Sequence, residues 1–344
     1  MNLIEIDGSS GEGGGQILRT SLSLSIISGA PFEIINIRAG RKNPGLRHQH
    51  LASVNAAARI CSASLEGASL GSACLKFIPK EVLSREYSFD IGTAGSTSLV
   101  YQTIFFPLAL RGNSVSLVNI TGGTHVPWSP PFEFLKEEWL LFMKRIGFRA
   151  DLELKRAGFY PKGGGEIVSR IEPVETISSL EIRERGELLK VYGISAVGGL
   201  SMEVAERGKN RLGKVLDENG IPNEVEAVEL PSYGRGAIVF LKAAFKNTTV
   251  SFSSTGEIGK RMETVAEEAC KKLIDFLGSD ATVDENMADQ LILPLALSPG
   301  RSYFKIPKAT EHIKTNAAVV SRFLENVKIQ IEGDEVVIEG GYPK

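Results

Sequence analysis

Ser88-Phe89-Asp90-Ile91-Gly92-Thr93-Ala94-Gly95-Ser96 decides how the chain is organised, because the same arrangement recurs on both sides of it. A strand-like segment leads through a glycine turn into an apolar helical run, Thr97 to Leu110, and then into the strand-like Val115 to Ile120. Similar series begin at Glu5-Ile6-Asp7 and at Ala281-Thr282-Val283-Asp284. The sequence therefore predicts an internal structural repeat.

Each repeat has the order βαβαββ, because a polar loop, a second helix and two short alternating segments follow the second strand. The first helices are expected at 16–28, 97–110 and 288–297, and the second helices at 51–61, 134–146 and 316–323. The closing strands are expected at 68–78, at 150–154 with 166–171, and at 327–331 with 335–339. The first two units begin about 83 residues apart, counted from Asp7 to Asp90.

The third unit is delayed by roughly a hundred residues, the size of a small domain. That stretch has its own strand-like segments and two amphipathic helices, at 190–195, 224–229, 237–243, 249–253, 202–218 and 261–276. We therefore predict an α+β protein. Three repeated βαβαββ units form a large domain of residues 1–179 and 280–344, and residues 180–279 form a smaller inserted α+β domain.

The composition indicates a soluble globular protein, since 42% of its 344 residues are hydrophobic and 23% are charged. A net charge of −2 gives no overall basic field, so any contact with nucleic acid must be local. Cys61, Cys74 and Cys270 lack metal-ligand spacing, which favours reduced thiols in a cytoplasmic protein. The chain begins with a strand-like segment and has no apolar stretch long enough for a bilayer, so we expect no signal peptide and no membrane partner.

His312 is the candidate nucleophile, in the segment Lys308 to Asn316 that follows the strand-like Tyr303 to Ile306. All four histidines lie on the loop after the second strand of a unit, the others being His48, His50 and His125. If the units pack about a pseudo-threefold axis, these loops converge. The structural alternative is a histidine that only packs or caps, which is the commoner role.

Two stretches of the first unit suit phosphate. Gly11 to Gln16 joins a strand to a helix, and its backbone N–H groups can approach an anion at the helix N-terminus. Within it Glu12 is a possible metal ligand, and Arg19 follows one turn into the helix. The second stretch, Arg38 to His50, is the densest cationic segment and is short enough to favour a terminal phosphate. The alternatives are a tight turn with a solvated glutamate and a solvated loop.

Two further motifs permit more than one interpretation. Asp289-Gln290 is expected to open the first helix of the third unit, where an aspartate can serve the helix terminus or orient His312. Gly158-Phe-Tyr-Pro-Lys-Gly-Gly-Gly165, between the closing strands of the second unit, is either a bulge for close backbone approach or a flexible hairpin.

Together these motifs resemble the RNA 3′-terminal phosphate cyclase family, and the resemblance covers nearly the whole chain. The matching residues are Asp7-Gly8, Gly11 to Arg19, Arg38-Ala-Gly-Arg41, Pro44-Gly-Leu46, Gln49-His-Leu51, Gly92 to Ser96, Gly122-Gly-Thr124, Phe159 to Gly165, Ala288-Asp-Gln290, and His312 with Thr315-Asn316. The chain departs from the family pattern at Ala157 and at Asn286-Met287, where the family often has a basic and an aromatic residue.

The resemblance implies ATP-dependent conversion of an RNA 3′-terminal phosphate to a 2′,3′-cyclic phosphate, with Mg²⁺ or Mn²⁺. His312 would carry AMP covalently, and AMP would pass to the RNA end before the 2′-hydroxyl displaces it. By motif match, the metal ligand would be Glu12, and the phosphate or RNA contacts would be Arg19, Arg38, Arg41, Gln49 and His50. The nucleotide pocket would be lined by Gln102, Pro131, Phe134, Asp289 and Gln290.

Two other functions fit a related fold. A non-catalytic relative involved in RNA processing or ribosome biogenesis would lack the nucleophilic histidine. An enolpyruvyl transferase shares βαβαββ repeats but typically has six units and no such insert. The sequence is compatible with a homo-oligomer without specifying one.

Overall fold

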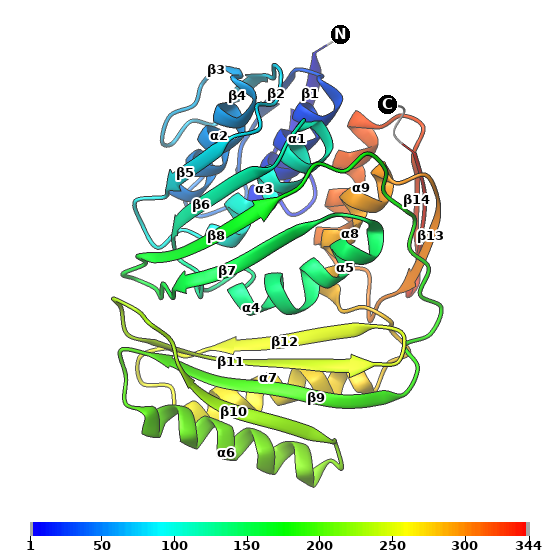
Figure 1. The fold of residues 1–344 in the computed structure, drawn as a ribbon. Helices are drawn as coiled ribbons and strands as arrows, with labels where there is room; N and C mark the ends of the chain where they lie inside the picture. Colours follow the sequence, from blue (N-terminus) through cyan, green and yellow to red (C-terminus); the bar gives the residue numbers. More distant parts are fainter. Residues whose placement is uncertain (1–2, 342–344) are drawn as a thin grey trace.

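The structure, a computed structural model, describes residues 3 to 341, and within them the chain forms four β-sheets flanked by helices (Figure 1). Three sheets have four strands with mixed pairing, and the fourth has three antiparallel strands. The strands of the large part are β1 (Ile4–Asp7), β2 (Phe32–Ile35), β3 (Ser64–Glu66), β4 (Leu75–Ile78), β5 (Glu86–Asp90), β6 (Ser116–Gly122), β7 (Ala150–Arg156), β8 (Gly165–Ile171), β13 (Gly300–Lys305), β14 (Lys328–Glu332) and β15 (Glu335–Gly340). The prediction of an α+β protein is confirmed.

The helices of this part lie between the sheets (Figure 1). They are α1 (Gly15–Ser28), α2 (His48–Cys61), α3 (Thr97–Arg111), α4 (Phe132–Phe134), a π-helical turn (Leu135–Trp139), α5 (Leu140–Ile146), α8 (Glu285–Leu297) and α9 (Glu311–Phe323). Helices α1, α3 and α8 are buried almost all round, as expected for helices enclosed by other elements.

The first two sheets have the same strand order and the same pairing. In the order β1-β2-β4-β3 the first pair is parallel and the others are antiparallel, and β5-β6-β8-β7 repeats this arrangement. This agreement is consistent with a repeated βαβαββ unit.

The third sheet corrects one sequence prediction, because residues 281–284 do not form a strand. The sheet has the order β13-β15-β14, and Glu181, in the segment between β8 and β9, pairs in parallel with Tyr303 of β13 instead. The Tyr303 N–H donates to the Leu180 carbonyl (2.9 Å), and the Ile182 N–H donates to the Tyr303 carbonyl (2.8 Å). Thr282 and Val283 contact β13 through Lys305: both N–H groups donate to the Lys305 carbonyl, and Thr282 Oγ1 accepts from the Lys305 N–H (2.9 Å). The chain then turns at Asp284 to begin α8.

The inserted segment forms a sheet of its own with the order β10-β9-β11-β12. Its elements are β9 (Leu188–Gly198), α6 (Met202–Glu218), β10 (Asn223–Glu229), β11 (Gly236–Phe245), β12 (Thr249–Thr255) and α7 (Met262–Leu277). Figure 1 shows α6 and α7 on one face of this sheet and the π-turn and α5 region near the other. A hydrophobic cluster separate from the main core fills the space between sheet and helices, including Val197, Leu212, Leu241 and Leu273.

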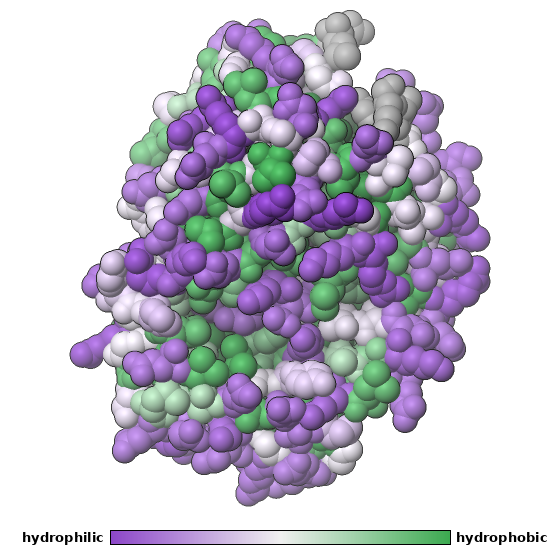
Figure 2. Space-filling model, in the orientation of Figure 1, coloured by the Kyte–Doolittle hydropathy of each residue, from purple (hydrophilic) through white to green (hydrophobic). Residues whose placement is uncertain are grey.

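The surface seen in Figure 2 is mostly hydrophilic, with hydrophobic side chains in separate small groups. No helix among the described residues is long and apolar enough to cross a membrane. Cys61, Cys74 and Cys270 are all free thiols, as the sequence predicts.

A buried pair of carboxyl groups joins Glu138 of the π-helical turn to Asp284, the N-cap residue of α8. Glu138 and Asp284 have almost no exposed surface, and the Ser251 hydroxyl of the inserted sheet donates to Glu138. Burial, followed by the neighbouring Asp284 carboxyl, raises the pKa of Glu138 well above its usual range, and burial also raises the pKa of Asp284. The pair therefore retains a proton in the folded protein at a pH where the unfolded chain has lost it.

We expect this proton to make the free energy of unfolding fall as pH rises above the usual carboxyl pKa, by on the order of 1 kcal/mol per pH unit while the pair titrates. Glu138→Gln is neutral at every pH and should lose less stability between pH 6 and pH 8 than the unchanged protein. Urea unfolding at both pH values measures this. Glu137→Gln, which removes a half-exposed partner of Lys242, is the matched control and should keep the pH dependence. Equal slopes for the unchanged protein and Glu138→Gln would contradict the expectation.

Candidate active site

Three helix N-termini meet at one place. The Glu12 N–H, in the glycine turn before α1, donates to Thr315 Oγ1 near the start of α9 (3.2 Å). A Cβ built on Gly15, the first residue of α1, would lie 2.3 Å from Nε2 of His50 in the first turn of α2. Helix N-termini favour anions, so their convergence creates a site suited to phosphate.

His312 lies inside this convergence, and its position corrects the expectation of a loop. Helix α9 begins at Glu311, and Thr310 caps it by accepting a hydrogen bond from the Ile313 N–H (3.3 Å). The histidine is therefore in the first helical turn, where the backbone fixes its direction. Its side chain is 54% exposed, so a ligand can reach the ring.

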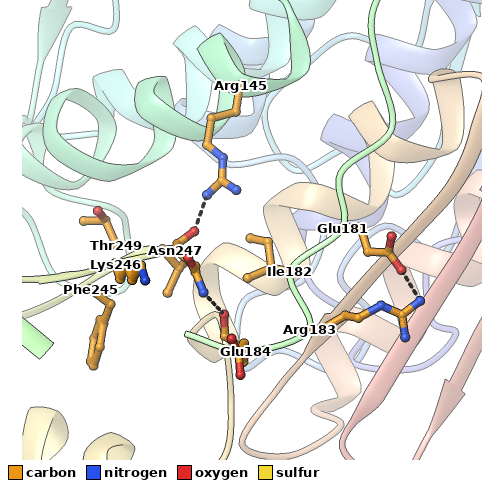
Figure 3. Close-up of a pocket in the computed structure, with 10 residues that line it drawn as sticks. Arg145, Glu181, Ile182, Arg183, Glu184, Phe245, Lys246, Asn247 and Thr249 are labelled. Atoms are coloured by element: carbon orange, nitrogen blue, oxygen red, sulfur yellow. Dashed lines mark hydrogen bonds and ion pairs between the residues drawn. The ribbon is translucent and has the colours of Figure 1, made fainter. Parts of the chain in front are cut away.

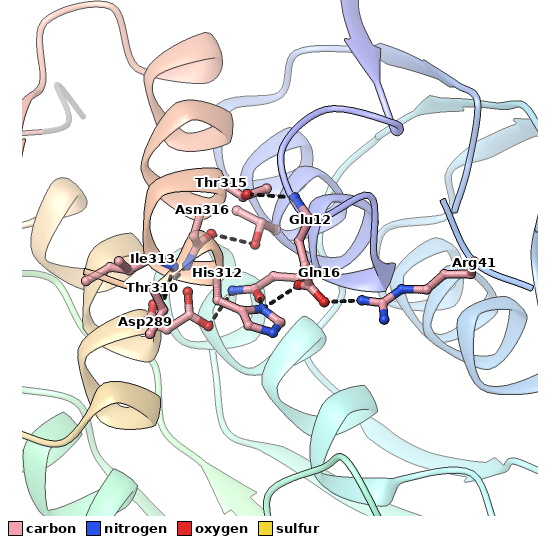
Figure 4. Close-up of polar contacts among 10 residues, drawn as sticks. Glu12, Gln16, Arg41, Asp289, Thr310, His312, Ile313, Thr315 and Asn316 are labelled. Carbon is pink, nitrogen blue, oxygen red and sulfur yellow. Dashed lines mark hydrogen bonds and ion pairs between the residues drawn. The ribbon is translucent and has the colours of Figure 1, made fainter. Parts of the chain in front are cut away.

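The contacts of His312 determine which ring nitrogen is free (Figure 4). Nδ1 lies 2.8 Å from Gln16 Oε1 and 2.7 Å from Glu12 Oε2. Both atoms are acceptors, so Nδ1 carries the proton. In the neutral imidazole, Nε2 then presents the lone pair that acts as a nucleophile.

A buried network of polar side chains from α1, α8 and α9 holds the His312 ring in position. The Gln16 amide donates to the Asp289 carboxylate, so one glutamine connects Asp289 to the imidazole. Asn316, one turn after His312, donates to the Asp289 carbonyl (2.8 Å) and accepts from Thr20 Oγ1 (2.8 Å). Burial raises the pKa of Asp289 to about 6, against the opposing effect of the Gln16 hydrogen bond. The network holds α1, α8 and α9 in register around the histidine.

The role of Gln16 was not predicted from the sequence, although Gln16 belongs to the glycine motif. The expectation that Asp289-Gln290 opens a helix was wrong. Helix α8 begins one turn earlier, because the Asp284 side chain accepts from the N–H groups of Asn286 and Met287. This shift places Asp289 on the inner side of the helix, where it is 6% exposed.

Arg19 and His50 supply the local electrostatics. Burial lowers the pKa of Arg19 to about 10, opposed by the carboxylates of Asp289 and Glu12, so the guanidinium stays charged at neutral pH. Burial, with the neighbouring Arg19, Arg38 and Arg47, lowers the pKa of His50 to about 3. His50 Nδ1 accepts from the Arg47 N–H (3.3 Å). A neutral His50 therefore has its proton on Nε2, where it can donate to an anion.

Of the other predicted phosphate contacts, Arg41 joins the His312 cluster, whereas Arg38 and Gln49 make contacts elsewhere. Arg41 pairs with Glu12 and so belongs to the His312 cluster. Arg38 donates instead to the carbonyls of its own loop, Asn43 (2.7 Å) and Gly45 (3.0 Å). Gln49 accepts from the Ser96 N–H at the start of α3 (3.1 Å), which joins the first two units.

The predicted nucleotide-pocket residues are only partly connected to this cluster. Asp289 is part of it, and Gln102 lies on α3 next to Thr103, whose carbonyl accepts from Ser23 of α1 (2.7 Å). Pro131 caps α4, Phe134 is buried and Gln290 is half-buried. Within residues 3–341, no hydrogen bond or ion pair joins these three residues to His312.

Two side chains of the predicted nucleotide pocket have a buried polar atom that is free to bond a ligand or water. Gln102 Nε2 and Asp289 Oδ1 have no hydrogen-bond partner among the described residues. Buried polar groups are normally satisfied, so such atoms mark places where a ligand or water completes the bonding.

His125 does not join the other histidines. Its side chain is fully buried, its Nε2 lies 2.9 Å from the Glu133 carboxylate, and its ring stacks on Phe159. The expected convergence therefore holds for His50 and His312 alone: His48 is exposed and has no contact with the His312 cluster within residues 3–341, and the His125 loop folds into the core.

The described residues contain no group of three or more His, Cys, Asp or Glu side chains that could hold a metal ion. The Glu12 carboxylate contacts Arg41 and His312. Mg²⁺ is commonly bound by one or two carboxylates together with substrate phosphates, so Glu12 fits such a site only when phosphates complete it.

A separate hollow of about 690 Å³ lies where the inserted sheet meets α5 (Figure 3). Its lining residues are Arg145, 181–184 and 245–249, and none of them belongs to the His312 cluster. Charges of both signs line it, including the Glu181–Arg183 ion pair. It does not extend the candidate active site.

The fold and the site thus define an α+β protein with an oriented, accessible histidine where three helix N-termini converge. Comparison with known proteins agrees. A family model described as RNA 3′-terminal phosphate cyclase matches residues 10–331. Proteins named RNA 3′-terminal phosphate cyclase are similar to this chain: one from Nostoc punctiforme is 43% identical over 97% of this chain and 98% of its own length. Others are from Pyrobaculum aerophilum (42%, over 93% and 92%) and Pseudomonas fluorescens (44%, over 94% and 93%). The chain belongs to the RNA 3′-terminal phosphate cyclase family.

Proposed function

We propose that this protein is an RNA 3′-terminal phosphate cyclase that consumes ATP and works through a covalent His312–AMP intermediate. The observation that carries the proposal is His312 itself: its Nδ1 is bound by two acceptors, its Nε2 is free, and helix N-termini surround it. The similarity to cyclases over nearly the full length supports the overall reaction.

In the first step, His312 Nε2 attacks the α-phosphorus of ATP. An N–P bond forms, the bond from the α-phosphorus to the bridging oxygen of the β-phosphate breaks, and pyrophosphate leaves. The imidazole gains positive charge in this step, and the Glu12 carboxylate at Nδ1 stabilises it. A covalent intermediate divides one difficult substitution into easier steps.

In the second step, an oxygen of the RNA 3′-phosphate attacks the phosphorus of His312–AMP, and the N–P bond breaks. The terminal phosphate is now bonded to AMP, which is a good leaving group. The neighbouring 2′-hydroxyl then attacks the terminal phosphorus, loses its proton to solvent and expels AMP. The product is a 2′,3′-cyclic phosphate.

The remaining site residues have roles that follow from their surroundings. Arg19, Arg41 and neutral His50 would contact the phosphates, and Gln49 would keep the second unit against them. Arg38 would shape its loop unless RNA draws its guanidinium away. Mg²⁺ or Mn²⁺, held by Glu12 and phosphate oxygens, would offset charge on the transferring phosphoryl group. Gln102, Pro131, Phe134, Asp289 and Gln290 would line the nucleotide pocket.

We also propose that residues 1–179 and 280–344 form the catalytic domain, built from three βαβαββ units, and that residues 180–279 form the inserted domain. The shared strand order of the first two sheets and the separate core of the insert support this division. A cytoplasmic location remains a prediction of the sequence.

The reaction can be tested with RNA carrying a radiolabelled 3′-phosphate. With ATP and Mg²⁺, the protein should make the label resistant to phosphatase, and without ATP it should not. A non-catalytic relative would leave the label sensitive under both conditions.

A further inference from the structure

Two exposed tyrosines lie on loops that meet: Tyr160 is in the turn between β7 and β8, and Tyr233 is in the loop between β10 and β11 of the inserted sheet, where Ala157 pairs with Ser232. Tyr160 is 67% exposed and Tyr233 is 64% exposed. Lys162 and Arg235 are also exposed, and the Arg156 guanidinium lies over the Tyr233 ring, 4.2 Å from its centroid. We call these five residues the tyrosine platform.

The platform is held in place by contacts from both parts of the chain. Lys162 Nζ donates to the Tyr233 carbonyl (2.7 Å), and the Ala157 N–H donates to the Pro231 carbonyl (2.8 Å). Phe159 is buried beneath it, so close to Gly236 that a Cβ there would lie 2.1 Å from its ring. The glycines of this turn are sites of close backbone approach, because a Cβ on Gly163 would lie 2.9 Å from Cα of Ala94 and a Cβ on Gly158 would lie 2.4 Å from the Gly165 nitrogen.

The platform is connected to the phosphate site through a short series of contacts. A Cβ on Gly163 would lie 2.9 Å from Cα of Ala94, in the turn before α3. Gly95 in the same turn lies against Gln49, and the Gln49 side chain accepts from the Ser96 N–H (3.1 Å). The next residue, His50, reaches the start of α1. An RNA strand whose 3′ end lies at His50 and Arg19 can thus extend across the turn before α3 to the two tyrosines.

The chemistry of the platform matches single-stranded RNA. Exposed aromatic rings interleaved with cations bind single strands by stacking bases and contacting the backbone. With a net charge of −2, the protein has no overall field to hold RNA, so stacking must supply part of the affinity. We propose that the tyrosine platform binds the RNA strand on the 5′ side of the reacting end, with bases stacked on Tyr160 and Tyr233. This inference rests on the proposed function and gives the inserted domain a role in substrate binding.

The test compares two 3′-phosphorylated RNAs, a decanucleotide and a dinucleotide, which differ in whether they can reach the platform. Tyr233→Ala and Tyr160→Ala should each weaken binding of the decanucleotide about tenfold, measured by fluorescence anisotropy, and leave dinucleotide binding unchanged. Tyr233→Phe should bind like the unchanged protein, because the ring remains. 2-Aminopurine placed upstream of the RNA end should be quenched on binding, and less so with Tyr233→Ala.

Tyr192→Ala is the matched control. Tyr192 is 42% exposed on the same inserted sheet and also has two lysines near its ring, but it lies towards the other end of β9 from Phe159. It should not alter RNA binding. Labelling of His312 by ATP should be normal in all variants, so its absence from the unchanged protein would count against the proposed function alone. Normal labelling with undiminished decanucleotide binding would overturn the platform, as would equal losses for both RNAs. Altered self-association with unchanged RNA binding would overturn it in favour of a protein contact.

Discussion

His312→Gln is expected to form no detectable covalent adenylate when incubated with α-labelled ATP and Mg²⁺. Glutamine keeps a polar side chain of similar reach next to Glu12 and Gln16, so the site should keep its shape. It has no lone pair able to displace pyrophosphate from phosphorus, so the first step has no nucleophile. The measurement is label retained on the denatured protein, which should be stable to alkali and labile to acid.

His48→Gln is the matched control for this experiment. His48 is exposed in the first turn of α2, and no contact joins it to the His312 cluster within residues 3–341. It should label at the normal rate. Normal labelling of His312→Gln would show that another residue is the nucleophile.

Gln16→Leu is expected to lower the rate of adenylylation by about 10- to 100-fold, the usual range for a group that orients a functional histidine. Leucine cannot accept a hydrogen bond from the His312 Nδ1–H group, and it breaks the connection to Asp289. The loss should be partial, because Glu12 Oε2 still lies 2.7 Å from Nδ1. Single-turnover labelling over a range of ATP concentrations measures the effect.

The pattern of the kinetic constants separates positioning from ATP binding. If Gln16 orients the imidazole, the maximal labelling rate falls while the ATP concentration at half-maximal rate stays nearly constant. Gln16→Glu retains an acceptor for Nδ1 and should recover part of the rate. A change only in the concentration dependence would assign Gln16 to the nucleotide instead.

Much of the fold was predictable because the repeated pattern of strands and helices is local. The Met202–Glu218 helix is capped by Ser201 and shows an apolar stripe, and its bounds were predicted correctly. The third unit was harder, because the segment that pairs with β13 is Leu180–Ile182, which comes before β9 and is separated from β13 by the whole inserted sheet. Nothing in the sequence of residues 281–284 indicates that Leu180–Ile182 occupies the position next to β13 that these residues were expected to fill.

The candidate site was predictable in its residue types and less so in its contacts. Thr310 and Asp284 are good capping residues, and reading them as such would have placed the starts of α9 and α8 correctly. The pairing of Gln16 with both His312 and Asp289 joins residues almost the whole chain apart, and no spacing rule encodes it. The burial of His125 likewise depends on Glu133 and Phe159, which only the folded chain brings to it.

The most direct test of the account is mass spectrometry of the adenylylated protein after digestion with trypsin at neutral pH. We expect an AMP adduct on the peptide Ala309-Thr-Glu-His-Ile-Lys314, with fragment ions that place it on His312. An adduct on a lysine or on any other histidine, or a protein that cyclises RNA ends without ever carrying AMP, would contradict it.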